Sequence, residues 1–198
     1  MKNKKSLQEE LGLPADEKKF VVGIVSRLTD QKGFDLIQCV MDELCSDDLQ
    51  LVVLGTGEER YENMFRHYDW KYHDRVSAQI YYSEAMSHKI YAASDAFLMP
   101  SLFEPCGLSQ LMALRYGTVP IVRETGGLKD TVEPYNEYEA RAQDSPLRII
   151  MLMRCWEACV MPSMSTAASG GSGNKNNRQG QWAKGLFNGG PLPPKYQE

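Results

Sequence analysis

The stretch KFVVGIVS, residues 19–26, is an almost unbroken run of apolar, mostly β-branched residues that ends at a serine, and it is typical of a buried strand. The segment FDLIQCVMDELC (34–45) has apolar residues at helical spacing, and it leads to a second apolar run, LQLVVLG (49–55). Strands without polar alternation are buried on both faces, as in parallel sheets covered by helices on both sides. This order predicts an α/β fold with a parallel sheet.

The same alternation of strands and helices continues to about residue 139. The further expected strands are AQIYY (78–82), AFLMP (96–100) and TVPIV (118–122), and the expected helices are SEAMSHKIYAAS (83–94) and GLSQLMALRY (107–116). We therefore predict a doubly wound α/β domain over residues 1–139. Ligands of such sheets bind beyond the carboxyl ends of the strands. The candidate loops are SRLTDQKG, GTGEE, YSEA, SLFEPCG and RETGG.

Composition limits the classes of partner. The net charge of −4 gives no general reason for binding nucleic acid or an anionic membrane surface. No run of about 18 apolar residues is present, so we expect no membrane span. The first residues, MKNKKSLQEELGL, lack the apolar core of a signal peptide, and we therefore expect a cytoplasmic protein.

Cysteine and histidine spacing does not indicate a disulfide framework or a metal site. The cysteines form an odd set: Cys39, Cys45, Cys106, Cys155 and Cys159. Cys155 and Cys159 lack a second pair or a nearby histidine. Glu84 and His88 are four residues apart, but the HExxH pattern of a zinc helix is absent. We expect reduced thiols and no metal.

Two loops follow the first two strands. In SRLTDQKG (26–33), Arg27 carries a planar guanidinium with paired donors, and Lys32 carries a compact ammonium charge. The two could converge on a phosphate or be solvated surface cations. The loop GTGEE (55–59) lacks both the full GxGxxG pattern and the Walker lysine, so a tight strand-to-helix turn is expected there.

The segment FEPCGLSQL is the most informative loop. Pro105 fixes the chain after Glu104, and a glycine two residues later permits close backbone approach. Three amides would be free donors at a helix start that attracts phosphate, those of Gly107, Leu108 and Ser109. Glu104 would then face a neutral sugar attached to that phosphate, which predicts a sugar–nucleotide site. The same acid could instead only stabilise the helix dipole.

Two further loops offer contacts to a ligand. Tyr82 closes the third expected strand, where its ring could stack on a nucleobase or pack in the core. Ser83 is expected to cap the next helix, with Met86 at its third position. Gly126 and Gly127 follow the last strand, where their amides could meet a polar ligand or form an ordinary helix-entry turn.

Together these segments resemble the C-terminal domain of bacterial ADP-glucose-dependent glycogen (starch) synthases, over roughly residues 4–139. The matching stretches are SRLTDQKGFDL, LVVLGTGEE and IYYSEAMSHKIYAASDAFLMPSLFEPCGLSQLMALRYGTVPIVRETGGLKDTV. The resemblance implies a GT-B fold, with two Rossmann-like domains and a cleft between them. It implies transfer of glucose from ADP-glucose, with retention, to the non-reducing end of an α-1,4-glucan, without metal or organic cofactor.

The resemblance also implies roles for the loop residues. Arg27 and Lys32 match cations that neutralise the departing diphosphate, and Glu104 matches the acid at the donor glucose. The implied substrate-binding residues are Tyr82 at the adenine, Cys106 beside the sugar, and the amides of Gly107, Leu108 and Ser109 at the phosphates, with Gly126 and Gly127 nearby. The family's N-terminal domain is absent from this chain, so we expect little or no activity from the chain alone.

Met112 stands where many retaining GT-B enzymes carry a second glutamate. This difference favours the bacterial ADP-glucose branch over a UDP-sugar or sucrose synthase-like enzyme. Another GT-B donor specificity and a non-catalytic nucleotide-binding remnant are the alternatives.

Beyond residue 139 the regular pattern ends. The family continues with a segment like GxGTGFxF, whereas this chain continues with ARAQDSPLRII (140–150). Permitted codons for this segment, read with one G restored in front, encode GKGTGFSFANY, and MLMRCWEACVMP re-reads as AHEMLGSMRYA. We therefore predict a single-base frameshift near residue 139. Residues 140–198 would then be an irregular or disordered tail, with no function for Cys155, Trp156, Cys159 and Trp182.

Overall fold

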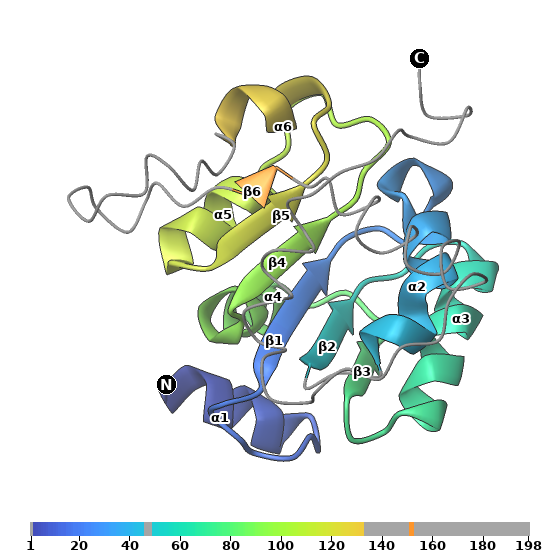
Figure 1. Ribbon diagram of the computed structural model, residues 1–198, viewed down its shortest axis with the longest axis vertical. Helices are drawn as coiled ribbons and strands as arrows, with labels where there is room; N and C mark the ends of the chain where they lie inside the picture. The colour runs from blue at the N-terminus through green and yellow to red at the C-terminus, as the bar shows by residue number, and fades with distance from the viewer. Residues whose placement is uncertain (1, 46–48, 133–150, 153–198) are drawn as a thin grey trace, which may run out of the picture. The chain divides into compact units, whose positions relative to one another are not determined.

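The computed structural model describes residues 2–45, 49–132 and 151–152 of the 198-residue chain, and Figure 1 shows them as a parallel sheet with flanking helices. The strands are β1 (Phe20–Val25), β2 (Leu49–Leu54), β3 (Val76–Gln79), β4 (Ala96–Met99), β5 (Val119–Val122) and β6 (Met151–Leu152). Their order is β3-β2-β1-β4-β5-β6, and every pairing is parallel. This is the order of a doubly wound, Rossmann-like sheet, so the predicted fold class is confirmed.

Helices connect successive strands, and three of them lie in the segments 34–45, 83–94 and 107–116 where the apolar spacing predicts them, whereas the helix between β2 and β3 has no such prediction. They are α1 (Lys2–Glu10), the 3₁₀ turn η1 (Asp30–Lys32), α2 (Phe34–Leu44), α3 (Glu59–Lys71), α4 (Glu84–Ala93), α5 (Ser109–Tyr116) and α6 (Gly126–Thr131). None of the helices in the described part of the chain has the length and apolar character needed to cross a membrane.

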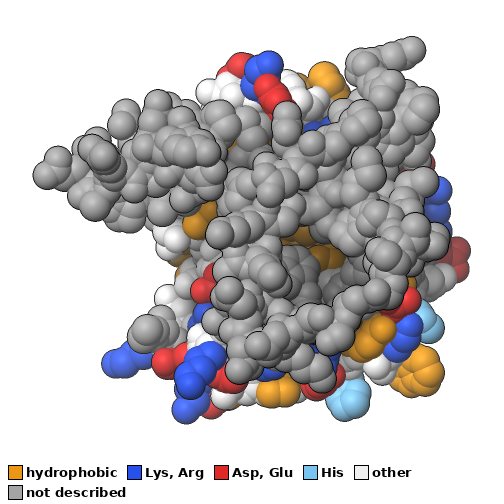
Figure 2. All heavy atoms as spheres, in the orientation of Figure 1, with side chains coloured by type: hydrophobic (Ala, Val, Ile, Leu, Met, Phe, Trp, Pro, Cys, Tyr) orange, Lys and Arg blue, Asp and Glu red, His pale blue; other side chains and the backbone are white. Residues whose placement is uncertain are grey.

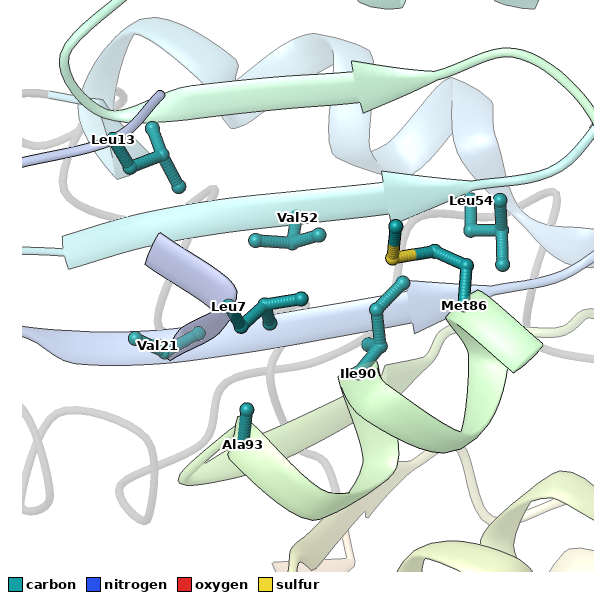
Figure 3. Packing of buried hydrophobic residues seen from close by; sticks show 8 residues of the cluster. All are labelled: Leu7, Leu13, Val21, Val52, Leu54, Met86, Ile90 and Ala93. Carbon is teal, nitrogen blue, oxygen red and sulfur yellow. The ribbon is translucent and has the colours of Figure 1, made fainter. Parts of the chain in front are cut away.

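One half of the core lies between the sheet and the pair α1 and α4. Leu7 of α1 and Ile90 of α4 pack with Val21 of β1 and Val52 of β2, as Figure 3 shows. Successive strand residues point to opposite faces. Neighbouring strand residues such as Leu51 are equally buried, so helices cover both faces of the central strands.

A partly buried ion pair fixes α1 to the sheet. Lys4 Nζ lies 2.8 and 2.6 Å from the two carboxylate oxygens of Asp95, which immediately precedes β4. Asp95 Oδ2 also accepts from the Val21 amide of β1 at 2.8 Å. A lysine in the basic N-terminal segment therefore stabilises the edge of the fold opposite to the carboxyl ends of the strands.

The predicted strand at 78–82 is misplaced. β3 instead runs Val76–Gln79, paired with β2 from Leu51↔Val76 to Leu54↔Gln79. Its partner β2 ends at Leu54, and the Gly55 amide closes the pairing on the Gln79 carbonyl at 3.1 Å. The end of the neighbouring strand, rather than the composition of AQIYY, therefore decides where β3 ends.

Within the predicted irregular tail, the structure describes only Met151–Leu152, which form β6 beside β5 with the register Ile121↔Met151 and Val122↔Leu152. These two residues are regular where the sequence pattern predicted no element. The remainder of the tail, including Cys155, Trp156, Cys159 and Trp182, lies outside the described residues.

Surface charges on the visible face are mixed. In Figure 2 the visible Lys and Arg side chains of the described residues are interspersed with Asp and Glu. A large single-sign patch is the usual electrostatic footprint of a nucleic-acid-binding surface, and none is seen on the described part of this face.

Candidate functional site

A pocket of about 170 Å³ lies beyond the carboxyl ends of β1 and β4. These two strands are neighbours at the centre of the sheet, and their connections leave in opposite directions to β2 and β5. Such a switch point leaves a crevice at the strand ends. The predicted site residues that line the pocket are Arg27, Lys32, Glu104, Gly107, Leu108 and Ser109.

An ion pair between Lys32 and Glu104 lies inside this pocket. Lys32 Nζ contacts Glu104 Oε2, and the two side chains are only 18% and 13% exposed. The Ser101 hydroxyl donates to the same carboxylate oxygen at 3.4 Å. Within the described residues Glu104 Oε1 has no hydrogen-bond partner, so one oxygen of this acid is available to a ligand.

Arg27 supplies a second cation to the pocket. Its side chain is exposed, and it forms no ion pair with any residue in the described ranges. Because Glu104 already neutralises Lys32, Arg27 gives the pocket a net positive charge. A pocket of this charge favours an anionic group over a neutral one.

Backbone hydrogen bonds hold the loop that carries Arg27 against the loop after β2. Leu28 donates from its amide to the Thr56 carbonyl at 2.9 Å and accepts from the Glu58 amide at 2.7 Å. A Cβ on Gly57 would stand 2.2 Å from the Leu28 carbonyl oxygen, so glycine is needed for this approach. The glycines of GTGEE therefore serve a backbone contact, and the loop is a tight turn as predicted.

Asp30 fixes the 3₁₀ turn that contains Lys32. Its carboxylate accepts from the Tyr61 hydroxyl and pairs with Arg60, and its amide donates to Glu58 Oε1 at 3.0 Å. The hydrogen bond from Tyr61, followed by that from Arg60, lowers the pKa of Asp30. The ionised carboxylate thus holds η1 against the start of α3.

The loops after β1 and β4 also contact each other directly. Leu102 donates from its amide to the Gln31 carbonyl at 2.9 Å, and Gln31 Nε2 donates to the Phe103 carbonyl at 3.2 Å. Gly33 has a φ of +73°, and a Cβ there would lie 2.1 Å from the Pro100 carbonyl oxygen. This close approach brings Lys32 within reach of Glu104.

The glycine pair after β5 supports the loop that carries Glu104. The Gly127 amide donates to the Glu104 carbonyl at 2.9 Å, and a Cβ on Gly126 would lie 2.3 Å from the same oxygen. The Gly127 amide, which was predicted to face a ligand, is therefore already engaged in a hydrogen bond within the chain. Neither glycine lines the pocket, and the geometry gives both a supporting position.

The start of α5 forms one wall of the pocket. The helix begins at Ser109 with Leu108 at the cap position, and a leucine side chain cannot satisfy the helix amides. Among the described residues, neither the Gly107 nor the Leu108 amide donates to a backbone carbonyl. Both are therefore available to an anionic ligand, as the sequence predicts for a helix N-terminus.

Gln110 is a residue that sequence reasoning missed. It is fully buried in the first turn of α5, and its Nε2 donates to the carbonyls of Cys106 and Gly107 at 3.1 and 2.9 Å. A glutamine on a helix is usually exposed. The only signal in the sequence is its position three residues after the glycine of the loop.

Two further predicted residues, besides the glycine pair, lie outside the pocket lining. Tyr82 is 85% exposed in the loop between β3 and α4, and Cys106 is an exposed free thiol next to Gly107. Ser83 caps α4 as predicted, with its hydroxyl accepting from the Met86 amide at 3.1 Å. The contacts predicted for Tyr82 and Cys106 stay predictions.

The described residues contain no group of three or more His, Cys, Asp and Glu side chains placed to hold a metal ion. The cationic groups and backbone amides of the pocket are instead suited to oxygen atoms of a phosphate, and the free oxygen of Glu104 is suited to a hydroxyl donor.

Comparison with known proteins gives a family and several relatives. The family model described as "Glycosyl transferases group 1" matches residues 7–156. A glycogen synthase from Lachnospira eligens is 81% identical over 140 residues, which is 71% of this chain and 29% of that protein. A glycogen synthase from Lachnoclostridium phytofermentans is 71% identical over 140 residues, with the same shares covered. The chain thus spans about 29% of the length of these relatives.

Among solved structures, the catalytic domain of starch synthase IV from Arabidopsis thaliana, bound to ADP and acarbose, matches with a TM-score of 0.68 at 31% identity. That match covers 93% of this chain and 37% of the plant chain.

Proposed function

The chain belongs to the glycosyltransferase group 1 family, and we propose that it is the nucleotide-sugar-binding domain of a glycogen (starch) synthase. The reaction proposed is transfer of glucose from ADP-glucose, with retention, to the non-reducing end of an α-1,4-glucan. The observation that carries this proposal is the pocket at the switch point, where Arg27, Lys32 and Glu104 meet the start of α5. The similarity to glycogen synthases, expected from the loop motifs, is confirmed by the relatives.

The phosphates of the donor fit the cationic side of the pocket. Arg27 is free to form a bidentate contact, and the amides of Gly107 and Leu108 donate from the adjoining wall. When the glycosidic bond to the donor breaks, the diphosphate gains negative charge. Donors already positioned at that charge stabilise the transition state without reorganisation.

The sugar of the donor fits the Glu104 side. A glucosyl group is neutral, so its hydroxyls can donate to the free Oε1 of Glu104 without charge repulsion. Lys32 has three donor hydrogens, and one is directed to Glu104. Its remaining donors are available to a phosphate oxygen. The ion pair thus bridges the sugar and phosphate ends of the bound donor.

The proposed enzyme needs a second wall for the cleft. Catalysis by positioning requires donor, acceptor glucan and catalytic groups to be held together, and this chain spans about 29% of its glycogen synthase relatives. We therefore expect nucleotide binding by the chain itself and little turnover unless the family's N-terminal domain is supplied.

The test is calorimetric titration of the purified chain with ADP, UDP and ADP-glucose, together with an assay of glucan extension with and without a supplied N-terminal domain. Selective binding of ADP over UDP, with turnover only after the domain is supplied, supports the proposal. A preference for UDP contradicts the donor assignment and favours a different glycosyltransferase.

The base contact has its own matched pair of variants. Tyr82→Ala is expected to weaken the binding of both ADP and UDP, because stacking of a base on an exposed ring is worth about 1–3 kcal/mol whichever base it is. The adjacent Tyr81, 40% exposed, serves as the control, and Tyr81→Ala should leave both affinities unchanged. Equal effects of the two substitutions would contradict the role of Tyr82.

A further inference from the structure

Gln110 has an unusual environment for a polar side chain. It has no solvent exposure, and its Nε2 has three acceptors within reach: the carbonyls of Cys106 and Gly107, and the Thr131 hydroxyl at 3.1 Å. Its Oε1 is buried without a hydrogen-bond partner among the described residues. An unsatisfied buried acceptor costs stability. An apolar side chain of the same length would remove that unpaired oxygen but would leave the Cys106 and Gly107 carbonyls without this donor, so the amide serves the loop backbone.

The two bonded carbonyls determine where two amides point. The described residues contain no cis peptide bond. In a trans peptide unit the C=O and the N–H point in opposite directions. The Cys106 carbonyl shares its unit with the Gly107 amide, and the Gly107 carbonyl shares its unit with the Leu108 amide. Holding both carbonyls on Gln110 therefore turns both amides away from the core, and Gly107 and Leu108 line the pocket.

We propose that Gln110 is a positioning residue that aims the Gly107 and Leu108 amides at the donor's diphosphate. This inference rests on the proposed function for the identity of the anion. The side chain acts through the loop backbone and lies behind it, so it does not itself touch the ligand. Its amide is the feature that matters, since the NH2 group carries two hydrogens and can donate one to each carbonyl.

The same side chain links the phosphate wall to the loop of the sugar side. Thr131 accepts from Gln110 and donates from its hydroxyl to the Gly127 carbonyl at 2.6 Å. The Gly127 amide in turn donates to the Glu104 carbonyl at 2.9 Å. Gln110 therefore holds the loop directly at Cys106 and Gly107, and through α6 at Glu104.

Gly107 is the residue that permits this arrangement. It has a φ of +70°, and a Cβ there would lie 2.5 Å from Gln110 Oε1. The glycine and the glutamine thus fit each other, which explains why the sequence places them three residues apart at the start of α5.

The test compares Gln110→Met with Gln8→Met. Gln8 is also buried, at 1% exposed; its Nε2 donates to Gln50 Oε1 at 2.7 Å, its Oε1 is likewise unpaired, and it does not line the pocket. Calorimetry on the full chain uses three probes: inorganic pyrophosphate, ADP and adenosine. Pyrophosphate reports on the phosphate wall alone, and adenosine on the base contact alone. Urea unfolding of each variant measures stability.

We expect Gln110→Met to weaken pyrophosphate and ADP binding by about tenfold or more, since a hydrogen bond to a charged group is worth more than one decade in affinity. Adenosine binding should not change. Gln8→Met should lower stability with unchanged affinity for all three probes. Thr131→Val, which removes one partner of Gln110, should weaken pyrophosphate binding in the same direction by a smaller factor, and it replaces Gln110→Met if that variant does not fold.

Each contrary result has one meaning. Unchanged pyrophosphate affinity in Gln110→Met and Thr131→Val, or no pyrophosphate binding by the wild-type chain, would overturn the inference. Equal losses for adenosine and pyrophosphate would also overturn it, because a merely structural role predicts both. If the wild-type chain binds pyrophosphate but not ADP, the proposed function fails while the role of Gln110 is still decided by pyrophosphate.

Discussion

Lys32 and Glu104 form an ion pair across the two loops that follow β1 and β4, the two central strands of the sheet. The pair is largely shielded from water, with 18% and 13% of the side chains exposed. It joins the cation that we assign to the diphosphate and the acid that we assign to the sugar. In the absence of a donor each group compensates the charge of the other.

This pair predicts opposite effects for two substitutions. Lys32→Met should weaken ADP binding by about ten- to a hundredfold, because it removes a donor and leaves the Glu104 carboxylate unpaired near the phosphates. Glu104→Gln should leave the affinity for ADP unchanged or higher, because it removes a negative charge. It should abolish any excess of the affinity for ADP-glucose over the affinity for ADP. Calorimetry with both ligands measures these changes.

The control for that pair of variants is Lys71→Met. Lys71 Nζ pairs with Asp42 at 2.6 Å, and Lys71 does not line the pocket. Lys71→Met should leave the affinities for ADP and ADP-glucose unchanged. If Glu104→Gln weakens ADP as much as Lys32→Met does, the division into a sugar side and a phosphate side is wrong.

The contact between Gly33 and Pro100 predicts a second effect. Gly33→Ala places a methyl group 2.1 Å from a carbonyl oxygen, whereas Gly117→Ala has a similar φ of +81° and nothing within 4 Å. Both variants carry backbone strain of about 1–2 kcal/mol, because alanine disfavours the left-handed conformation. Gly33→Ala should lower the free energy of unfolding by a further 1–3 kcal/mol, roughly the cost of overpacking. Urea unfolding measures the difference, and equal losses in both variants would mean that the loop adapts freely.

Most of the fold could be predicted from the sequence because the strands and the helices α2, α4 and α5 are marked by local apolar patterns. The topological rule for parallel sheets then places the loops after β1 and β4 together, which is why Arg27, Lys32 and Glu104 could be predicted to converge. The end of β3 could not be predicted, because it depends on where the neighbouring strand β2 ends.

The supporting residues could not be predicted for the same reason. Gln110 appears on a helix whose pattern gives no sign of burial, and its partners Gly107 and Thr131 belong to a loop and to another helix. For Gly126 and Gly127 the sequence left a ligand contact and a helix-entry turn open, and in the structure their nearest neighbours belong to the loop after β4. Contacts between loops distant in sequence leave no local signal.

Acid should weaken the attachment of η1. The pKa of Asp30 is lowered in the folded chain by the hydrogen bond from Tyr61 and then by Arg60. A carboxylate with a lowered pKa contributes stability above its unfolded value of 3.8, and this contribution is lost as pH falls through the folded pKa. The difference in unfolding free energy between wild type and Asp30→Asn should therefore be largest above about pH 5. It should disappear as the pH falls below the unfolded pKa. Denaturant titrations across this range measure the difference, and a difference that widens toward low pH contradicts the assignment.

Thiol labelling should separate the cysteines by environment. Burial, followed by the charge of Asp42, raises the pKa of Cys45 to about 11, so its thiolate is scarce at pH 8. Cys39 and Cys106 are exposed and should react with N-ethylmaleimide while Cys45 does not. ADP-glucose should protect Cys106, next to the pocket, and leave Cys39 unprotected as the internal control. Peptide mapping by mass spectrometry measures each site, and protection of both cysteines would point to a general change of the fold rather than to a ligand beside Cys106.

The coding frame near residue 139 gives the last prediction. Codons that permit ARAQDSPLRII encode GKGTGFSFANY after one G is restored, and this reading matches every defined position of the family pattern GxGTGFxF. The Lachnospira and Lachnoclostridium glycogen synthases each match over 140 residues, which is the extent expected if the shared frame ends near residue 139. One observation argues against a frameshift at this point: the match to the family model continues to residue 156.

Sequencing the underlying DNA decides between a frameshift near residue 139 and a tail that is encoded in frame. We expect a one-base difference that restores GTGF and extends the similarity to glycogen synthases beyond the present 140 residues. The corrected chain should also show higher stability in urea than the present one, because the restored segment can supply a longer strand beside β5 than the two residues of β6. A DNA sequence in which no one-base change restores the motif would show that residues 140–198 are encoded in frame, and the tail would then have to be explained as part of the protein.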